Sequence, residues 1–248
     1  MQRYDPYLET SNLLEAERWR STMATWVITG ANRGLGLEFV KQLLASGHQI
    51  IAGVRQIDSM PIRHEDLTVF ALDVSSGDSV NQFAEQVKTI TNQIDVLVNN
   101  AGRMDGRWQS LDEVDPEISL EVMNVNTIGP LRVSQALWPL LQNSALTKVA
   151  NISSLMGSIE DCMSGRSYAY RTSKTGLNMI SKVLAVEGQK DNITVTAYHP
   201  GWAKTDMGGE RAPVPVSDSV RGLIGLINNQ ETEKTGRFFE YTGEELPW

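Results

Sequence analysis

A tyrosine and a lysine four residues apart, Tyr170 and Lys174, form the stretch of the sequence best suited to acid–base chemistry. Residues at this spacing share one face of a helix, so both side chains can point into the same cleft. A phenol has an unperturbed pKa of about 10, and a neighbouring ammonium favours the phenolate, which brings the group closer to working pH. Such a tyrosine can pass a proton to a carbonyl oxygen. Tyr168 lies on a different helical face and is predicted to be a wall or packing residue.

A glycine-rich turn, TGANRGLG over residues 29–36, is the second stretch that predicts a site. It joins an apolar strand to a helix. Glycine permits positive φ and lets backbone N–H groups approach a pyrophosphate at the helix N-terminus, where the dipole favours negative charge. The spacing of Gly30, Gly34 and Gly36 differs from the commoner G-x-G-x-x-G pattern. In this context the turn predicts a dinucleotide site, and a tight turn without a ligand is the alternative.

The end of the second strand helps to choose between dinucleotides. An NAD site usually places an acidic residue there to hold the ribose 2′-hydroxyl. This sequence has Arg55 at that position, and Arg33 lies inside the glycine turn. Two guanidinium groups can bind a 2′-phosphate with bidentate geometry, which favours NADP(H) over NAD(H). Asp58, three residues after Arg55, means that NAD(H) is still possible. The alternative interpretation is that Arg33 and Arg55 are solvated surface residues that bind no phosphate.

Two further strands end in residues that can line an adenine and a ribose. The third strand ends in Asp73 and Val74, and the fourth in Asn99, Asn100, Ala101 and Gly102. Ligands of parallel α/β sheets lie at these carboxyl ends. The small residues at 101 and 102 would let a cofactor pass close to the backbone, whereas a plain turn explains the same letters.

Short β-rich runs alternate with helical periods along the chain and must position these groups. Strands are predicted at residues 25–29, 49–54, 67–72, 94–98, 148–152, 192–198 and 237–240. The pattern predicts an α/β fold, a doubly wound parallel sheet of about seven strands with helices on both faces. We find no repeat or linker that would divide residues 24–248 into two domains. Residues 1–23 are interpreted either as an N-terminal extension or as the result of a misplaced start at Met1 instead of Met23.

Bulk composition excludes several classes of function. The 248-residue chain has a net charge of −8 and no run of Lys or Arg, so nucleic acid is not expected as a partner. No stretch approaches the roughly 20 apolar residues that span a bilayer, and a single cysteine, Cys162, points to a reduced, cytoplasmic compartment. The three histidines have no cysteine or carboxylate partners at ligand spacing, so no metal is expected.

Six motifs occur in order along the chain: TGANRGLG (29–36), NNAG (99–102), Asn126, SS-x-x-G (153–157), Y-x-x-x-K (170–174) and PG-x-x-x-T (200–205). With these six motifs in this order, the chain resembles the short-chain dehydrogenase/reductase (SDR) family from about residue 24 to the C-terminus. The segments HPGWAKTDMGG and GRFFEYTGEELPW are similar to the sniffer-type carbonyl reductase and C-factor branch. The resemblance implies a Rossmann-type fold.

The resemblance also implies a catalytic set of Asn126, Ser154, Tyr170 and Lys174. Ser154 is selected over Ser153 because the family serine stands three residues before the glycine, and it would polarise the substrate carbonyl. Asn126 would hold a water that links the lysine to solvent, with Asn124 a competitor only if the register slips by two. Lys174 would also bind the nicotinamide ribose.

For the cofactor, the resemblance adds residues after the sixth strand. Thr205 would hold the nicotinamide carboxamide, and Trp202 either walls the nicotinamide or packs in the core. The complete predicted cofactor set is Gly30, Asn32, Arg33, Gly34, Leu35, Gly36, Arg55, Asp73, Val74, Asn100, Ala101, Gly102, Tyr170, Lys174, Pro200, Gly201, Trp202 and Thr205.

The prediction is an NADPH-dependent oxidoreductase that transfers hydride to an aldehyde or ketone, or oxidises the corresponding alcohol. An NADP-binding regulatory or signalling protein with the same fold and little turnover is the alternative. The helix of Tyr170 and Lys174 carries an apolar stripe of Leu177, Ile180, Val183 and Leu184 that suits a homodimer as well as the core. Cys162 and Met163 either border the mouth of the pocket or lie in a solvated loop.

Overall fold

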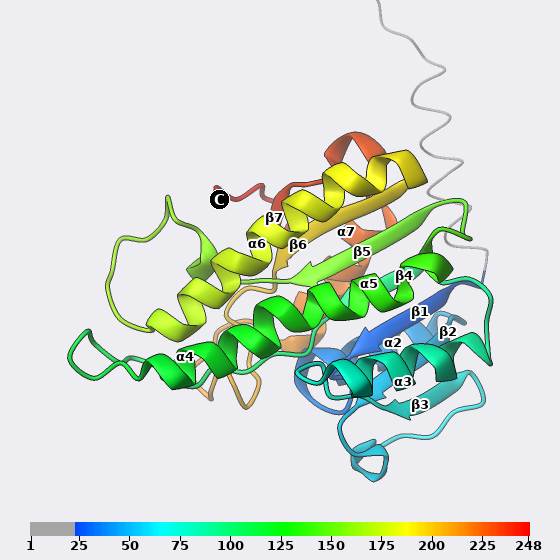
Figure 1. Ribbon diagram of the computed structural model, residues 1–248, viewed down its shortest axis with the longest axis horizontal. Coiled ribbons are helices and arrows are strands. Elements are labelled where there is room, and N and C mark those ends of the chain that lie inside the picture. The colour runs from blue at the N-terminus through cyan, green and yellow to red at the C-terminus, as the bar shows by residue number, and fades with distance from the viewer. Residues whose placement is uncertain (1–22) are drawn as a thin grey trace, which may run out of the picture.

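A seven-stranded parallel sheet runs through the computed structural model, which describes residues 23–248 (Figure 1). The predicted extension over residues 1–23 lies, except for Met23, outside the described residues. The strands are β1 (Thr25–Thr29), β2 (Gln49–Val54), β3 (Leu67–Ala71), β4 (Val96–Asn99), β5 (Thr147–Ile152), β6 (Ile193–His199) and β7 (Phe238–Glu240). Their order is β3-β2-β1-β4-β5-β6-β7 and every neighbouring pair is parallel, so the predicted doubly wound α/β fold is confirmed.

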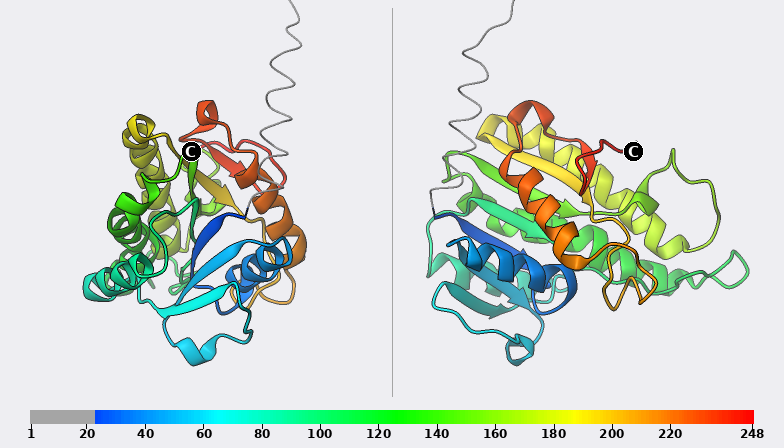
Figure 2. Two further views of the ribbon diagram at one scale, coloured as in Figure 1. Left: turned by 90° about the vertical axis from the view of Figure 1, so that its right-hand side faces the viewer. Right: turned by 180° about the vertical axis from the view of Figure 1, so that it is seen from behind.

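Helices cover both faces of this sheet. They are α2 (Gly34–Ala45), α3 (Gly77–Lys88), α4 (Pro116–Met123), α5 (Gly129–Leu141), α6 (Tyr168–Gly188) and α7 (Val216–Asn228), with the short turns η1 (Ile57–Ser59), η2 (Asn124–Ile128), η3 (Leu155–Gly157), η4 (Gln189–Asp191) and η5 (Thr232–Lys234). One face packs against α2 and α7, and the other against α3, α5 and α6 (Figure 2). The chain therefore has two apolar cores separated by the sheet.

Alternation along the strands divides the apolar residues between these cores. In β1, Trp26 and Ile28 join the core under α2 and α7, whereas Val27 joins the core under α3 and α5. The period of two follows from the pleat of the strand. Because both faces of the central strands are buried, these strands are nearly continuous apolar runs, and this is why the sequence predicted them.

The direction of strand addition reverses at β1. From β1 the chain adds β2 and β3 on one side, then crosses to β4 on the other side and continues to β7. In open α/β sheets, ligands bind in the crevice at the carboxyl ends of the strands beside such a switch point. The glycine turn after β1 and the NNAG segment after β4 therefore lie at one crevice.

The predicted apolar stripe on α6 divides between core and surface. Leu177 and Leu184 are buried, whereas Val183 is half exposed. The apolar side chains that α6 exposes are Val183, Met179 and Val186. Within residues 23–248, no helix combines the length and the apolar character that a bilayer crossing requires.

Candidate active site

A cleft of about 990 Å³ opens at the carboxyl ends of β1 and β4. Most of the predicted cofactor residues line it: Gly30, Asn32, Arg33, Gly34, Leu35, Arg55, Asp73, Val74, Asn100, Ala101, Gly102, Tyr170, Lys174, Pro200 and Thr205. Gly36, Gly201 and Trp202 do not line it. The structure thus brings residues from six segments of the chain to one concave surface, with the glycine turn and the Tyr170 helix both facing it.

The three glycines of the first turn are required for different physical reasons. Gly30 and Gly34 have φ of 66° and 53°, the left-handed region that favours glycine. A Cβ on Gly36 would lie 2.2 Å from the carbonyl oxygen of Gly30, so Gly36 permits close packing and lies behind the cleft wall. No side chain caps the N-terminus of α2, which leaves its first N–H groups available to an anion. The turn therefore fits a pyrophosphate.

Arg33 and Arg55 both line the cleft, as the NADP(H) prediction requires. Arg33 pairs with Asp206 at 3.6 Å across the cleft rim. Arg55 lies close enough to Asp73 to contribute, after two hydrogen bonds from Ser75, to the lowered pKa of that carboxyl. Asp58, the residue that kept NAD(H) open, is exposed in η1 and does not line the cleft.

Tyr170 and Lys174 lie on the first turns of α6, both buried, with exposed fractions of 7% and 5%. The Lys174 ammonium donates to the carbonyl oxygen of Ile152 at 2.8 Å and lies 5.7 Å from the centroid of the Tyr170 ring. The predicted one-turn spacing therefore places both groups at the same end of the cleft. Tyr168 is partly exposed and does not line the cleft.

Burial shifts both of these groups toward their neutral forms. It raises the pKa of Tyr170 to about 12, although a hydrogen bond with Ser154 and the charge of Arg107 act in the opposite direction. It also lowers the pKa of Lys174 to about 8. Burial thus moves the pKa of the tyrosine in the direction opposite to the shift that a neighbouring ammonium favours, because loss of hydration outweighs the nearby charges. Tyr170 is a protonated phenol at neutral pH.

Ser154 is buried and is not among the residues that line the cleft, but its hydroxyl lies close enough to the Tyr170 phenol to lower the pKa of that group. Ser154 also caps η3 by accepting from the Met156 N–H at 3.2 Å. Ser153 lines the cleft, but its hydroxyl donates to Asn178 at 2.5 Å. A Cβ on Gly157 would lie 2.7 Å from the backbone of Lys174, so the glycine lets η3 pack directly on α6. This contact explains the spacing between the serine and the glycine.

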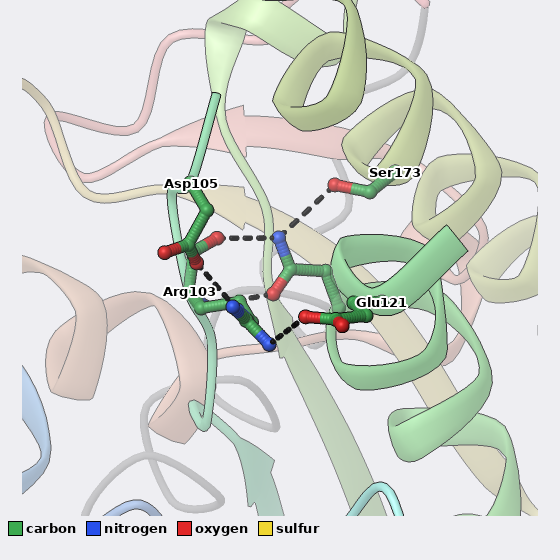
Figure 3. Close-up of polar contacts among 5 residues, drawn as sticks. Arg103, Asp105, Glu121 and Ser173 are labelled. Carbon is green, nitrogen blue, oxygen red and sulfur yellow. Dashed lines mark hydrogen bonds and ion pairs between the residues drawn. The ribbon is translucent and has the colours of Figure 1, made fainter. Parts of the chain in front are cut away.

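Asn126 is fully buried within the π-helical turn η2. Its side chain accepts from the Arg103 N–H at 2.9 Å, donates to the Arg103 carbonyl at 2.8 Å and donates to Ser173 at 3.0 Å. The guanidinium of Arg103 pairs with Asp105 and, at 3.1 Å, with Glu121 (Figure 3). Asn126 thus joins the loop after β4 to α6.

Asn124, the competitor for this position, points elsewhere. Its amide donates to the Ser75 carbonyl at 3.2 Å and accepts from Arg132 at 2.8 Å. Asn124 therefore supports the segment after β3, whereas Asn126 alone of the two contacts the helix of Tyr170.

The segment after β6 differs in part from prediction. Trp202 is half exposed, so the prediction that it packs in the core is wrong. Its Nε1 donates to the Gly208 carbonyl at 2.8 Å. It lines a neighbouring pocket and not the main cleft. Gly201 has φ of 70°, and a Cβ there would meet Tyr241 at 2.7 Å, so this glycine serves packing. Thr205 does line the cleft.

The sequence reasoning missed the loop that follows NNAG. Arg103, Met104, Asp105 and Arg107 all line the cleft. The only signal for them was their place after the carboxyl end of β4, since the loop has no periodic pattern. Cys162 and Met163 line neither pocket and are exposed, which agrees with a solvated loop. Residues 23–248 contain no group of three or more His, Cys, Asp or Glu side chains that could hold a metal ion.

Comparisons with known proteins agree with this geometry. The family model described as short chain dehydrogenase matches residues 24–214. The chain is 42% identical to the C-signal of Myxococcus xanthus over 158 residues, 64% of this chain and 95% of the relative. Two solved structures are similar over the whole fold. The NADPH bound carbonyl reductase from chicken fatty liver is 32% identical, with a TM-score of 0.84 over 91% of this chain and 99% of the other.

The second structure is the carbonyl reductase Sniffer of D. melanogaster, 30% identical with a TM-score of 0.86 over 92% of this chain and 100% of the other. The resemblance to the sniffer-type and C-factor branch is therefore confirmed. The family match over most of the chain, together with this likeness in sequence and fold, shows that the chain belongs to the short-chain dehydrogenase family of oxidoreductases.

Proposed function

We propose that this protein is an NADPH-dependent reductase of aldehydes or ketones, with the reverse oxidation of an alcohol chemically equivalent. The observation that carries the proposal is the buried, protonated phenol of Tyr170, which lies at the end of the cleft close to the Ser154 hydroxyl and to the Lys174 ammonium. A protonated phenol can donate to an oxygen that gains charge during reduction. The carbonyl reductase from chicken fatty liver, whose structure holds NADPH, supports the choice of cofactor.

The residues of the cleft fit NADPH. The uncapped N-terminus of α2 and the turn at Gly30 and Gly34 would bind the pyrophosphate, and Arg33 and Arg55 the 2′-phosphate. Lys174 would bind the nicotinamide ribose. When bound, NADPH supplies the hydride that reduces the carbonyl carbon.

The side chains of this protein would handle the proton. The Tyr170 hydroxyl would donate it to the carbonyl oxygen, and the Ser154 hydroxyl would hold that oxygen by a hydrogen bond. Asn126 would support a path to solvent. Its side chain contacts both the loop after β4, at Arg103, and α6, at Ser173, and so supports the position that the resemblance gives to such a path.

The rival is an NADP-binding regulatory or signalling protein with little turnover. The 42% identity to a protein named C-signal is the observation that supports this second hypothesis. The presence of Tyr170, Ser154 and Lys174 together argues against it, because a binding protein has no need for a buried phenol beside a serine hydroxyl and a lysine.

NADPH consumption with a panel of aldehydes and ketones tests the proposal. Tyr170→Phe should still bind NADPH but lose turnover by roughly a hundredfold or more, since proton transfer is removed. Tyr168→Phe is the matched control on the same helix and should keep its activity. If wild-type protein binds NADPH but reduces nothing, or if Tyr170→Phe is as active as wild type, the regulatory reading takes its place.

Two other parts of the sequence-based reading stay predictions. A homodimer through α6 would use the exposed side chains of Met179, Val183 and Val186. Sedimentation velocity of the wild type and of Val183→Glu would test it. The reduced, cytoplasmic location follows from cysteine usage alone.

A further inference from the structure

A second pocket of about 580 Å³ opens beside the main cleft. Its walls come from the loop after β4 and from the segment between β6 and α7, which lie at the same end of the sheet (Figure 1). The lining residues are Arg107, Trp108, Trp202, Gly208, Gly209, Glu210 and Arg211. None of the functions assigned above uses this pocket.

Arg107 connects the pocket to the site of proton transfer. It lines both the pocket and the main cleft, and its charge is felt at the Tyr170 phenol. Its guanidinium donates to the Met207 carbonyl at 3.1 Å, which joins the two loops. Arg107 therefore lies where the main cleft and the second pocket meet.

Two indoles give this pocket an apolar surface. Trp108 and Trp202 are 57% and 50% exposed, although tryptophan is mostly buried in folded proteins. The Arg107 guanidinium lies 5.2 Å from the centroid of the Trp108 ring. Aromatic rings contribute a large apolar contact area, and a guanidinium stacked on such a ring keeps its charge available to a carboxylate.

Trp108 is held in a strained backbone conformation. Its φ is 65°, a region that non-glycine residues rarely adopt. Its N–H donates to the Ser167 hydroxyl at 3.0 Å, and the Ser167 N–H donates to the Gln109 carbonyl at 3.1 Å. Such strain persists only where the surroundings enforce it, and it occurs most often at functional positions. The backbone that carries the indole is thus fixed in place before a ligand arrives.

The charges of the pocket do not cancel. Arg107 and Arg211 contribute two positive charges and Glu210 one negative charge. Among residues 23–248, neither arginine has a carboxylate partner, whereas Arg33, Arg221 and Arg237 each pair with one carboxylate and Arg103 pairs with two. In a chain with net charge −8, a pocket of charge +1 beside two indoles matches a monoanion.

We infer that the substrate is a carbonyl compound that carries a carboxylate, with its apolar body against Trp108 and Trp202 and its carboxylate at Arg107 and Arg211. The inference rests on the proposed reductase function. A monoanion is chosen over a phosphate because Glu210 would repel a dianion.

Two aldehydes, one with and one without a negative charge, test it: 4-formylbenzoate and its methyl ester. The quantity compared is the ratio of kcat/KM for the acid to that for the ester, with NADPH as the reductant. The two aldehydes differ in intrinsic reactivity, but this difference is the same for every variant and cancels when the ratios of two variants are compared. Arg211→Gln should lower the ratio about fivefold, the upper range for an exposed ion pair, and added salt should lower it in the wild type.

Arg221→Gln is the matched control, because Arg221 lies on the exposed side of α7 and pairs with Asp218 at 3.1 Å. It should leave the ratio unchanged. Arg107→Gln should also lower the ratio, but Arg107 influences Tyr170, so Arg211 gives the cleaner result. An equal ratio in wild type and Arg211→Gln, with both aldehydes reduced, overturns the carboxylate site and leaves the reductase function standing.

Failure to reduce either aldehyde points to the proposed function instead. Calorimetric titration of the NADP⁺-loaded protein with the same two compounds then separates the two ideas. Tighter binding of 4-formylbenzoate than of its ester, lost in Arg211→Gln, supports the anion site in a protein that is not a reductase. Absence of any charge-dependent binding overturns the anion site as well.

Discussion

The ammonium of Lys174 donates to the carbonyl oxygen of Ile152 at 2.8 Å and faces the Tyr170 ring, with 5.7 Å between nitrogen and ring centroid. The lysine therefore fastens α6 to the end of β5. Burial lowers its pKa to about 8 and raises that of Tyr170 to about 12, so the two groups lose their protons in separate ranges of pH. The lysine titrates first.

Carbonyl reduction at saturating NADPH is expected to fall as pH rises through about 8, because Lys174 loses its charge there while Tyr170 stays protonated. Stability should move in the opposite direction. Between about pH 8 and 9.5 the unfolded chain, whose lysine pKa is about 10.5, binds more protons than the folded chain, so the lysine makes stability rise with pH. Urea titrations at several pH values measure this, with Lys174→Met as the control that removes the rise. Activity that is flat across pH 7 to 9 would contradict this role of the lysine.

Arg55→Ala is expected to raise the Kd for NADPH about tenfold and to leave that for NADH nearly unchanged, since only NADPH carries the 2′-phosphate. Fluorescence titration with both cofactors measures the difference. Arg63→Ala is a suitable control, because its guanidinium donates only to the main-chain carbonyls of Met60 and Ile62. Equal losses for both cofactors would show that Arg55 does not contact the phosphate.

Asn126→Ala removes the partners of the Arg103 N–H and carbonyl, and leaving buried polar groups unpaired costs about 1–3 kcal/mol. We expect the free energy of unfolding in urea to fall by that amount and turnover to fall with it. Asn124→Ala is the comparison, because Asn124 contacts Ser75 and Arg132 instead of α6. Loss of turnover in Asn124→Ala but not in Asn126→Ala would reverse the assignment.

Deletion of Trp248 is expected to loosen the loop between η3 and α6. The carbonyl of this C-terminal residue accepts from the N–H groups of Ile159 and Glu160 and from the Ser158 hydroxyl, and its ring stacks on Phe238 at 5.7 Å. Hydrogen exchange at Ile159 and Glu160 should become faster, and proteolysis should cut residues 158–167 first. Unchanged exchange in the deleted chain would show that the loop holds its shape without this anchor.

The parts of this protein that the sequence could predict are those with regular spacing. Buried parallel strands are continuous apolar runs, so all seven were found, although β4 begins at Val96 and not at Ile94. The glycine turn and the one-turn spacing of Tyr170 and Lys174 are equally local. Ser154 could be separated from Ser153 only by the family pattern, and the packing of Gly157 on Lys174 supplies the reason for it.

Properties that depend on three-dimensional surroundings could not be predicted. The pKa of Tyr170 moves upward because the fold buries the phenol, and no neighbour in the sequence reports burial of that degree. Trp202 follows a recognisable motif, yet its indole turns toward Gly208. Arg107 and Trp108 belong to a loop without periodicity, and only the approach of the segment after β6 makes them part of a pocket.

Ser167 stands immediately before α6 and also accepts the N–H of Trp108. The wall of the second pocket and the starting point of the helix that carries Tyr170 are thus one connected unit. A substitution that shifts the backbone at Trp108 would therefore also move the Tyr170 phenol. Arg211 lies on a separate segment, so its substitution would leave the phenol in place. If Arg211 binds the substrate carboxylate as proposed, an exchange there would change the choice of substrate without moving the phenol.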